Sequence, residues 1–387
     1  MKTWLCSVAS SQGARKEFKI AHIYGKTGPL EAYGKQTATG FMMALDYATG
    51  GTMMVAGKKI VVIEKDDQGK PDIGKSVLAA AYGDDKVDRA VGPTASPVAL
   101  AMLPVAEEYN KILLVEPAVA DSITGDKWNK YIFRTGRNSN QDAAANAAAL
   151  DKSGNLVATL ANDNAFGRDG VKATRESLKH AKIVHEEYLA VGTTDFTAGL
   201  QRIIDKLKDQ PGKKYISVGW SGASAPFSKI ADLELKKRYG IELATGGNIL
   251  PAMVAYKQFP GMEGALYYYF GIPKNAINDA MVSRHYSHFK TSPDFFTVGG
   301  FSAAMAVVTA LTNSKGDTAA NTLIKTMEGM SVDTLKGKMT FRKEDHQAMQ
   351  SMYHVKIKAD PAFARGVPEL VREIKAEEMT IPVRNKR

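Results

Sequence analysis

The sequence predicts an α/β protein built from two lobes, each containing a doubly wound parallel sheet. Short apolar stretches alternate with helical stretches of roughly 10–15 residues, which is the pattern of βαβ units. The alternation runs once before Arg134 and again after it, so two similar arrays follow each other along the chain. The length of 387 residues agrees with two domains, at roughly 100–200 residues per domain.

The first array begins with a strand and a glycine-rich turn. Strands are expected at residues 18–24, 59–65, 89–91 and 111–115. The helix after the turn carries apolar side chains at a spacing of three to four, namely Phe41, Met42, Leu45 and Tyr47. A second helix opens at Pro71, as proline does in a first helical turn, and a third spans residues 97–109.

The second array repeats this pattern. Helices are expected at residues 141–150, 166–180, 196–208 and 227–238, and strands at residues 156–161, 182–188, 215–218 and 241–245. After it the sequence predicts a buried aromatic strand at 265–270, helices at 276–289 and 297–311, and β-like stretches at 338–341 and 350–356. No long Pro- or Ser-rich linker separates the arrays, so short crossovers must join the lobes.

Composition excludes several classes of protein. The 51 Lys and Arg against 41 Asp and Glu give a net charge of +10, which suits an anionic ligand or a negatively charged surface but does not argue for nucleic acid. The one cysteine, Cys6, excludes an internal disulfide and a cysteine-based zinc cluster. No apolar run approaches the roughly 18–20 residues that span a bilayer. Residues 1–16 are expected to be a leader remnant or an added segment outside both lobes.

Enzyme motifs are incomplete along the chain. No G-x-G-x-x-G follows the first strand, so the dinucleotide fingerprint is missing. Trp220-Ser221-Gly222 resembles a nucleophile elbow, but its second glycine comes one residue too soon. We therefore expect no enzyme activity, no cofactor and no metal. A doubly wound α/β enzyme stays open as an alternative of another class, and it would require a titratable cluster in the cleft.

The ends of the strands are more informative. Ser96 stands as an N-cap before a helix that opens at Pro97, where a hydroxyl and free amides can bind an anion. The amides of Ala118 and Ala120 follow the next strand at the same sheet edge and are expected to complete a carboxylate cradle. Tyr33, in the loop after the first strand, points to that edge as well. Ligands of open α/β sheets bind beyond the carboxyl ends of strands, so these residues predict a small-molecule site.

Four segments together resemble the leucine/isoleucine/valine-type periplasmic binding proteins, the solute receptors of ATP-binding-cassette importers. The segments are 27–34, 91–96, 133–135 and 162–167, with the sequences TGPLEAYG, VGPTAS, FRT and NDNAFG. The resemblance covers residue 17 to about residue 358 in order. It implies the type I fold of these proteins, in which two α/β lobes are joined by three crossovers and close on the ligand.

The resemblance also implies where the lobes divide. The crossovers are expected near Gly136, Gly271 and Asp345. The first lobe then comprises residues 17–136 and 272–345. The second lobe comprises residues 137–271 and 346–387.

The family's amino-acid site can be carried over residue by residue. Its carboxylate clamp corresponds here to Ser96 and Ala118, and a threonine of the family is replaced by Ala120. Tyr33 matches the tyrosine of the first loop, and Phe166 matches the aromatic residue of the second lobe. The expected ligand-binding residues of this chain are therefore Tyr33, Ser96, Ala118, Ala120, Phe166, Trp220, Ser221, Asn248 and Phe296.

One position departs from the family. The acidic residue that pairs with a ligand ammonium aligns with Asn248, and a neutral amide cannot balance that charge. Aromatic residues that align near the cleft, such as Trp220 and Phe296, favour a flat apolar ligand. The sequence therefore predicts a receptor for a small aromatic or apolar carboxylate. A receptor for a branched-chain amino acid or amide is the alternative within the family.

This prediction includes the partners and the compartment. We expect a monomer in the periplasm that binds a small carboxylate and delivers it to the membrane permease of an importer. No nucleic acid is expected to bind.

Overall fold

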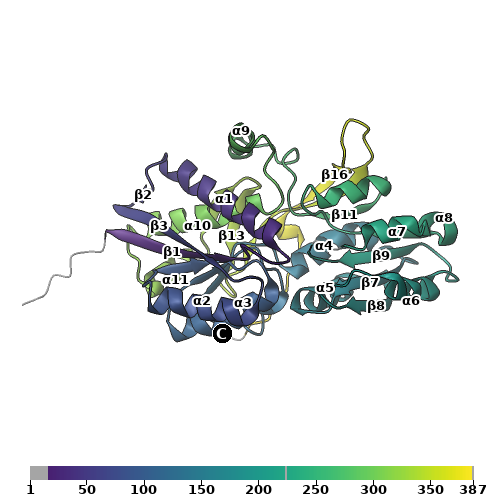
Figure 1. Ribbon diagram of the computed structural model, residues 1–387, viewed down its shortest axis with the longest axis horizontal. Helices are drawn as coiled ribbons and strands as arrows, with labels where there is room; N and C mark the ends of the chain where they lie inside the picture. The colour runs from purple at the N-terminus through teal and green to yellow at the C-terminus, as the bar shows by residue number, and fades with distance from the viewer. Residues whose placement is uncertain (1–15, 223–224, 386–387) are drawn as a thin grey trace, which may run out of the picture.

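The computed structural model describes residues 16–222 and 225–385, arranged as two lobes side by side along the long axis of the molecule (Figure 1). The segment predicted to be a leader remnant or an added tail lies almost wholly outside the described residues. The two-lobe α/β fold predicted from the sequence is confirmed.

The first lobe is built on a six-stranded sheet in the order β2-β3-β1-β4-β5-β6. Its strands are parallel except β2, which runs antiparallel to β3. Their bounds are β1 Glu17–Tyr24, β2 Met54–Val55, β3 Lys58–Asp66, β4 Arg89–Val91, β5 Leu113–Val115 and β6 Ile132–Arg134. The short strands β4, β5 and β6 are buried along their whole length, as expected for parallel strands covered on both faces of the sheet.

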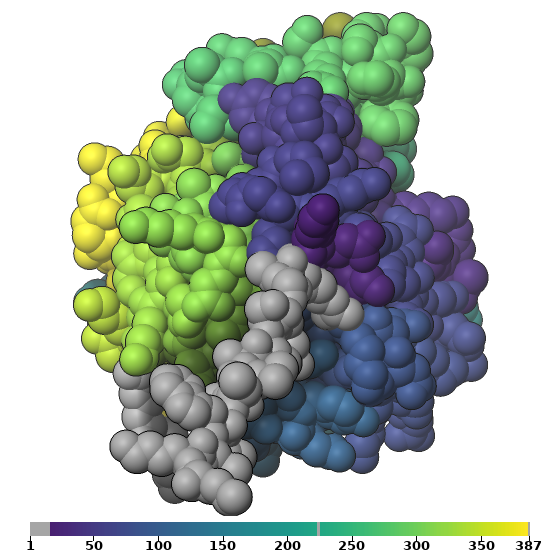
Figure 2. Space-filling view, turned by 90° about the vertical axis from the view of Figure 1, so that its left-hand side faces the viewer, coloured from purple at the N-terminus to yellow at the C-terminus, as the bar shows by residue number. Residues whose placement is uncertain are grey.

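Helices cover both faces of this sheet: α1 Glu31–Thr49, α2 Pro71–Gly83, α3 Ser96–Glu108, α10 Thr297–Asn313 and α11 Ala320–Met327. A further helix, α9 Ala276–Phe289, lies at the outside of the molecule (Figure 1). Helices α1 and α10 pack against each other although they are far apart in sequence. Figure 2 views this lobe end-on and shows the purple and blue N-terminal elements beside the light-green elements of α10 and its neighbours.

The second lobe is built on a parallel four-stranded sheet in the order β10-β9-β7-β8. Its strands are β7 Leu156–Asn162, β8 Lys182–Leu189, β9 Lys214–Gly219 and β10 Ile241–Ala244. Its helices are α4 Ser139–Leu150, α5 Ala165–Ser177, α6 Thr197–Leu207, α7 Phe227–Asp232 and α8 Leu235–Tyr239, with the 3-10 helix η2 Ala252–Gln258. Helix α6 packs Leu200, Ile203, Ile204 and Leu207 into the core of this lobe.

Two small antiparallel sheets complete the fold. One contains β11 Glu263–Leu266, β15 Met352–Lys358 and β16 Val367–Ile374, and the other contains β12 Ser331–Thr334, β13 Gly337–Phe341 and β14 Ala348–Met349. The 3-10 helices η1 Asp121–Ile123 and η3 Ala376–Glu378 lie in loops. The chain crosses between the lobes after β6, between β11 and α9, and between β14 and β15, which gives the three crossovers of the predicted fold. The lobe limits proposed from the sequence stay a prediction.

Several predicted elements are corrected by the structure. The helix expected at 227–238 is two helices, α7 and α8, because Glu234 has a left-handed φ of 45° that interrupts the helical backbone. The strand expected at 265–270 ends at Leu266, and Tyr267, Tyr268 and Tyr269 after it are buried without strand pairing. Helix α11 and strand β16 were not predicted. Most of β16 is exposed, so it lacks the apolar alternation that announces a strand.

Candidate functional site

A cavity of about 190 Å³ lies between the two lobes. The first lobe lines it with the start of α1, the start of α3 and the segment after β5. The second lobe contributes the start of α5 and the segments after β9 and β10. These are the carboxyl ends of parallel strands, where α/β proteins bind ligands. Of the nine residues predicted to bind the ligand, all but Ala120 line the cavity.

Ser96 is the first residue of α3, and Ala95 takes the N-cap position that was predicted for Ser96. Its Oγ accepts hydrogen bonds from the amides of Val119, at 3.2 Å, and Ala120, at 3.1 Å. A hydroxyl has two acceptor lone pairs and one donor hydrogen, so these bonds use its acceptor capacity. The remaining O–H is suited to a ligand oxygen that only accepts, such as that of a carboxylate.

The expected cradle of amides is only partly formed. The Ala120 amide was expected to be free for the ligand, but it donates to Ser96, and Ala120 does not line the cavity. Ala118 does line it, and no hydrogen bond from its amide is found among the described residues. The segment is held by the buried Arg134, which donates to the Ala120 carbonyl oxygen at 2.7 Å. Arg134 is therefore a structural residue that shapes the site.

Tyr33 reaches across the cavity from the first lobe to the second. It lies within α1, not in the preceding loop as expected, and its hydroxyl accepts from the Gly222 amide at 3.4 Å. The same hydroxyl donates to Asn248 Oδ1 at 3.4 Å, and burial raises the pKa of Tyr33. The ring of Phe296 lies against that of Tyr33, with centroids 4.5 Å apart. The two lobes are therefore in contact at the cavity through Tyr33.

The NDNAFG segment folds so that α5 begins at the cavity. Asn164 is its N-cap, with the side-chain oxygen accepting from the Gly167 amide at 3.1 Å. A Cβ on Gly167 would lie 1.9 Å from the carbonyl oxygen of Asn162, so only glycine allows this close turn. The turn brings Phe166 to the cavity wall.

Trp220 and Ser221 follow β9 on the opposite side of the cavity. Trp220 is buried and meets Phe196 edge-on, with centroids 5.1 Å apart. Both the amide and the hydroxyl of Ser221 donate to Asn162 Oδ1, at 2.8 and 3.1 Å. An amide oxygen does not activate a serine as a nucleophile, so Ser221 fixes the loop.

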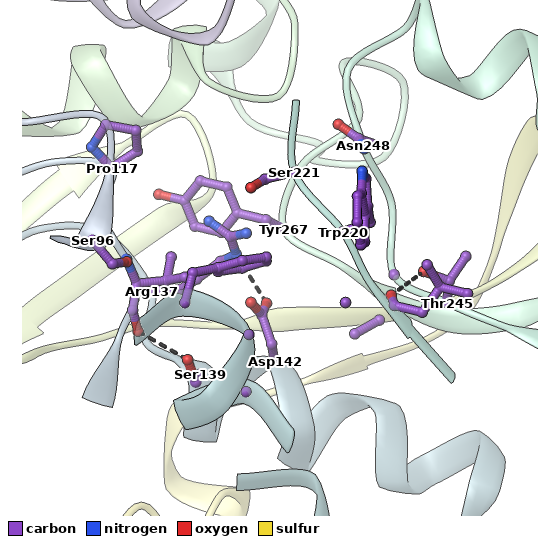
Figure 3. Close-up of a pocket in the computed structure, with 18 of the residues that line it drawn as sticks. Ser96, Pro117, Arg137, Ser139, Asp142, Trp220, Ser221, Thr245, Asn248 and Tyr267 are labelled. Atoms are coloured by element: carbon purple, nitrogen blue, oxygen red, sulfur yellow. Dashed lines mark hydrogen bonds and ion pairs between the residues drawn. The ribbon is translucent and has the colours of Figure 1, made fainter. Parts of the chain in front are cut away.

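Two charged residues of the cavity wall were not predicted from the sequence. Arg137 follows the first crossover, and its Nε donates to Asp142 Oδ1 of α4 at 2.9 Å (Figure 3). Among the described lining residues, these two alone are charged. Burial raises the pKa of Asp142, while the adjacent Arg137 opposes that rise. The only sequence signal was the position of Arg137 next to the crossover expected near Gly136.

Two further buried ionisable residues, Lys336 and Glu116, lie near Arg137 but do not line the cavity. Lys336 Nζ is 3.8 Å from the ring centroid of Tyr267, and burial lowers the pKa of Lys336 well below its usual value. Glu116 accepts from the Thr135 hydroxyl at 2.9 Å, and burial raises the pKa of Glu116 to about 7. No group of three or more His, Cys, Asp or Glu in the described part of the chain is arranged to hold a metal.

A fold of two α/β lobes with a ligand-sized cavity between them is that of the periplasmic binding proteins. The family model described as "Periplasmic binding protein" matches residues 17–362, and the chain belongs to this family. The family resemblance found in the sequence is confirmed. Of the helices in the described ranges, none combines the length and apolar character needed to cross a bilayer.

Three relatives show the range of the likeness. A crystal structure named as an ABC-type branched-chain amino acid transporter from Rhodopseudomonas palustris CGA009 is 63% identical with a TM-score of 0.85, covering 96% of this chain and 100% of that one. A solute binding protein of an ABC transporter from R. palustris BisB5, in complex with 3,4-dihydroxy benzoic acid, is 26% identical with a TM-score of 0.81, covering 94% and 98%. A Leu/Ile/Val-binding protein of Rhizobium johnstonii is 31% identical over 52% of this chain and 55% of its own length. The chain thus spans about half the length of the curated relatives it matches.

Proposed function

We propose that this protein is the periplasmic solute receptor of an ATP-binding-cassette importer and that it captures a small aromatic or apolar carboxylate. The observation that carries the ligand class is the charge of the cavity wall, where Arg137 and Asp142 are paired with each other. A ligand ammonium would meet no unpaired carboxylate among the described lining residues. Burying an ammonium without a partner costs several kcal/mol, so the wall favours an acid without an amino group.

The shape of the cavity supports a single-ring ligand. Aromatic side chains line it from both lobes, namely Tyr33, Phe166, Trp220, Phe227, Tyr256, Tyr267, Phe295 and Phe296. A cavity of about 150 Å³ admits benzene, so the 190 Å³ found here has room for a ring and a carboxylate. Each aromatic contact with a ring adds roughly 0.5–1.5 kcal/mol beyond the area buried.

Asn248 supports the same ligand class. Its Oδ1 accepts from the Ile249 amide at 2.8 Å as well as from Tyr33, so this oxygen is already engaged within the protein. The Asn248 amide nitrogen can donate to a ligand hydroxyl or carbonyl oxygen, but it cannot balance an ammonium. In this reading the polar groups orient the ligand and the aromatic faces hold it.

A branched-chain amino acid is the second candidate. The relative that is 63% identical is named as a branched-chain amino acid transporter. Such a ligand would pair its ammonium with Asp142, of which only Oδ1 is engaged by Arg137. The expected partner is in either case the importer's permease, to which a monomer with closed lobes presents the ligand, and the ligand leaves chemically unchanged.

Calorimetry with four ligands tests the proposal. Phenylpropionate and phenylpyruvate are expected to bind more tightly than phenylalanine and leucine. Asn248→Glu is expected to reverse or narrow this order, because a carboxylate there gives an ammonium a partner and repels anions. Asn248→Gln, which stays neutral, is the matched control and should keep the order. Tight binding of leucine or phenylalanine with no binding of the two acids would establish the amino-acid reading instead.

A further inference from the structure

We infer that Arg137 is the residue that selects anions in this cavity, and that Asp142 positions its guanidinium for a ligand carboxylate. The inference rests on the proposed function and names the residue through which the carboxylate is recognised. It places the recognising charge at the first crossover, between the lobes, and not on either lobe's strand ends.

The guanidinium of Arg137 is held in one plane. Its Cζ lies 5.1 Å from the ring centroid of Tyr267 and 4.9 Å from that of Phe295. Both rings also line the cavity. Contact of a cation with aromatic faces orients a planar guanidinium, and Arg137 keeps only 8% of its surface exposed. A buried cation held in this way is pre-organised for a planar anion.

The hydrogen bonds of Arg137 leave its outer edge available. Among the described residues the guanidinium makes one hydrogen bond, from Nε to Asp142. A guanidinium has five N–H donors, so the four on its two Nη atoms are left for another acceptor. A carboxylate matches this pair of nitrogens with two parallel hydrogen bonds, the strongest contact that arginine makes.

The surrounding charges favour an incoming anion. Lys336 lies against the same Tyr267 ring as Arg137, so two basic side chains flank one aromatic residue behind the cavity, although burial lowers the pKa of Lys336. Glu116 faces both basic side chains, and burial holds its pKa at about 7, so it is only partly ionised at neutral pH. A ligand carboxylate at Arg137 would lie near both basic side chains.

The Ser96 hydroxyl completes the anion site. Figure 3 places Ser96 and Arg137 on the same side of the cavity, opposite Trp220 and Thr245. Ser96 keeps only its donor function, and Arg137 has only donors. Neutral or cationic groups of a ligand would leave these donors unsatisfied in a partly dry site, which costs affinity.

Matched ligands isolate the carboxylate. Phenylpropionate and its primary amide, phenylpropionamide, have nearly the same shape and differ in charge, so the ratio of their affinities measures anion recognition alone. Calorimetry is expected to show that Arg137→Met lowers the affinity for phenylpropionate by about a hundredfold or more. The affinity for phenylpropionamide should fall by less than about threefold. Arg137→Lys keeps the charge but loses the bidentate hydrogen bonding, and it should lower the affinity for the acid by about tenfold.

Asp142→Asn separates positioning from ligand binding. If Asp142 only orients Arg137, this variant lowers the affinity for phenylpropionate by about three- to tenfold. Phenylpropionate should still bind more tightly than phenylalanine. Because Arg137→Met leaves the partly buried Asp142 without its partner, the double variant Arg137→Met with Asp142→Asn is measured as well. It removes both charges together, and it should lose the preference for the acid while its thermal midpoint stays close to that of the unmodified protein.

Two results overturn the inference, and a third would overturn the proposed ligand class alone. Unchanged acid affinity in Arg137→Met, or in the double variant, shows that Arg137 does not hold the carboxylate. If Asp142→Asn loses affinity for phenylalanine or leucine but not for the aromatic acids, Asp142 binds an ammonium. If the unmodified protein binds leucine and not the aromatic acids, the proposed ligand class fails, and the ratio of leucine to leucinamide then tests Arg137 by itself.

Discussion

The Ser96 hydroxyl links stability and recognition at the scale of one residue. It accepts hydrogen bonds from the buried amides of Val119 and Ala120, and its own hydrogen can be donated to a ligand. We predict that Ser96→Ala weakens binding of the acid by about tenfold to a hundredfold, because a hydrogen bond to a charged oxygen is worth roughly 1.5–3 kcal/mol. Calorimetry measures the affinity, and urea unfolding measures the stability that the two orphaned amides also lower.

Ser139→Ala is the control for this change. Ser139 also lines the cavity, and its hydroxyl donates to the Val119 carbonyl oxygen at 3.1 Å, so its removal disturbs the same segment without removing the proposed ligand donor. Stability should fall in both variants and affinity only in Ser96→Ala. Equal losses of affinity would mean that Ser96 acts by holding the segment.

Glu116 predicts a pH dependence of stability. Burial raises its folded-state pKa to about 7, against about 4.5 for an ordinary glutamate, although Thr135, Arg137, Lys336 and Arg134 oppose the rise. Between these two values the folded state binds more protons than the unfolded state, so the free energy of unfolding falls as the pH rises from about 4.5 to 7. The full loss amounts to about 3 kcal/mol at most.

Glu116→Gln tests this dependence. The amide keeps the shape of the side chain and cannot ionise, so its urea-unfolding free energy should decline less steeply between pH 5 and 7 than that of the unmodified protein. Equal slopes for the two proteins would show that Glu116 does not titrate in this range.

At the scale of elements, α1 and α10 pack closely through glycine. A Cβ on Gly40 would lie 1.9 Å from the Thr297 carbonyl oxygen, and one on Gly300 would lie 1.9 Å from that of Thr37. We predict that Gly40→Ala lowers the free energy of unfolding by about 3 kcal/mol, because backbone must move to admit the methyl group. Urea unfolding measures the change.

Gly170→Ala is the opposite case and serves as the control. Gly170 also lies in a helix, α5, but a Cβ there meets nothing within 4 Å. Alanine should therefore raise stability by roughly 0.5–1 kcal/mol through its better helix propensity. A loss in Gly40→Ala as small as the change at Gly170 would mean that the two helices separate at little cost.

The whole molecule is expected to close on its ligand. Tyr33 of the first lobe is hydrogen-bonded to Gly222 and Asn248 of the second, and a ligand that touches both lobes favours the closed arrangement. Small-angle scattering should show a smaller radius of gyration when the protein is saturated with the acid. An unchanged profile with binding verified by calorimetry would contradict closure.

Tyr33→Phe tests the contact between the lobes. The variant keeps the ring against Phe296 but removes the hydroxyl that bridges to the second lobe. The ligand-free variant should have a larger radius of gyration than the unmodified protein. Its affinity for the acid should be about three- to tenfold lower. A ligand-free profile identical to that of the unmodified protein would show that these long hydrogen bonds do not hold the lobes together.

Much of this architecture could be predicted from local patterns. The alternation of apolar strands and amphipathic helices predicted two parallel sheets, because burial imposes these periods on the sequence wherever an element packs against a core. The residues after the strands predicted where the cavity lies. The break at Glu234 and the exposed strand β16 could not be predicted, because neither carries such a pattern.

The sequence by itself determined the fold class, the family and eight residues of the cavity wall. Only the tertiary structure decided what those residues do. Ser96 meets an amide 23 positions away, and Tyr33 meets Asn248 at a separation of 215. Arg137 and Asp142 became candidates only once the cavity was known, because a charged pair beside a strand end looks the same in sequence whether it faces water or a ligand. Hydrogen bonds and burial depend on neighbours in space, and no local period in the sequence records those neighbours.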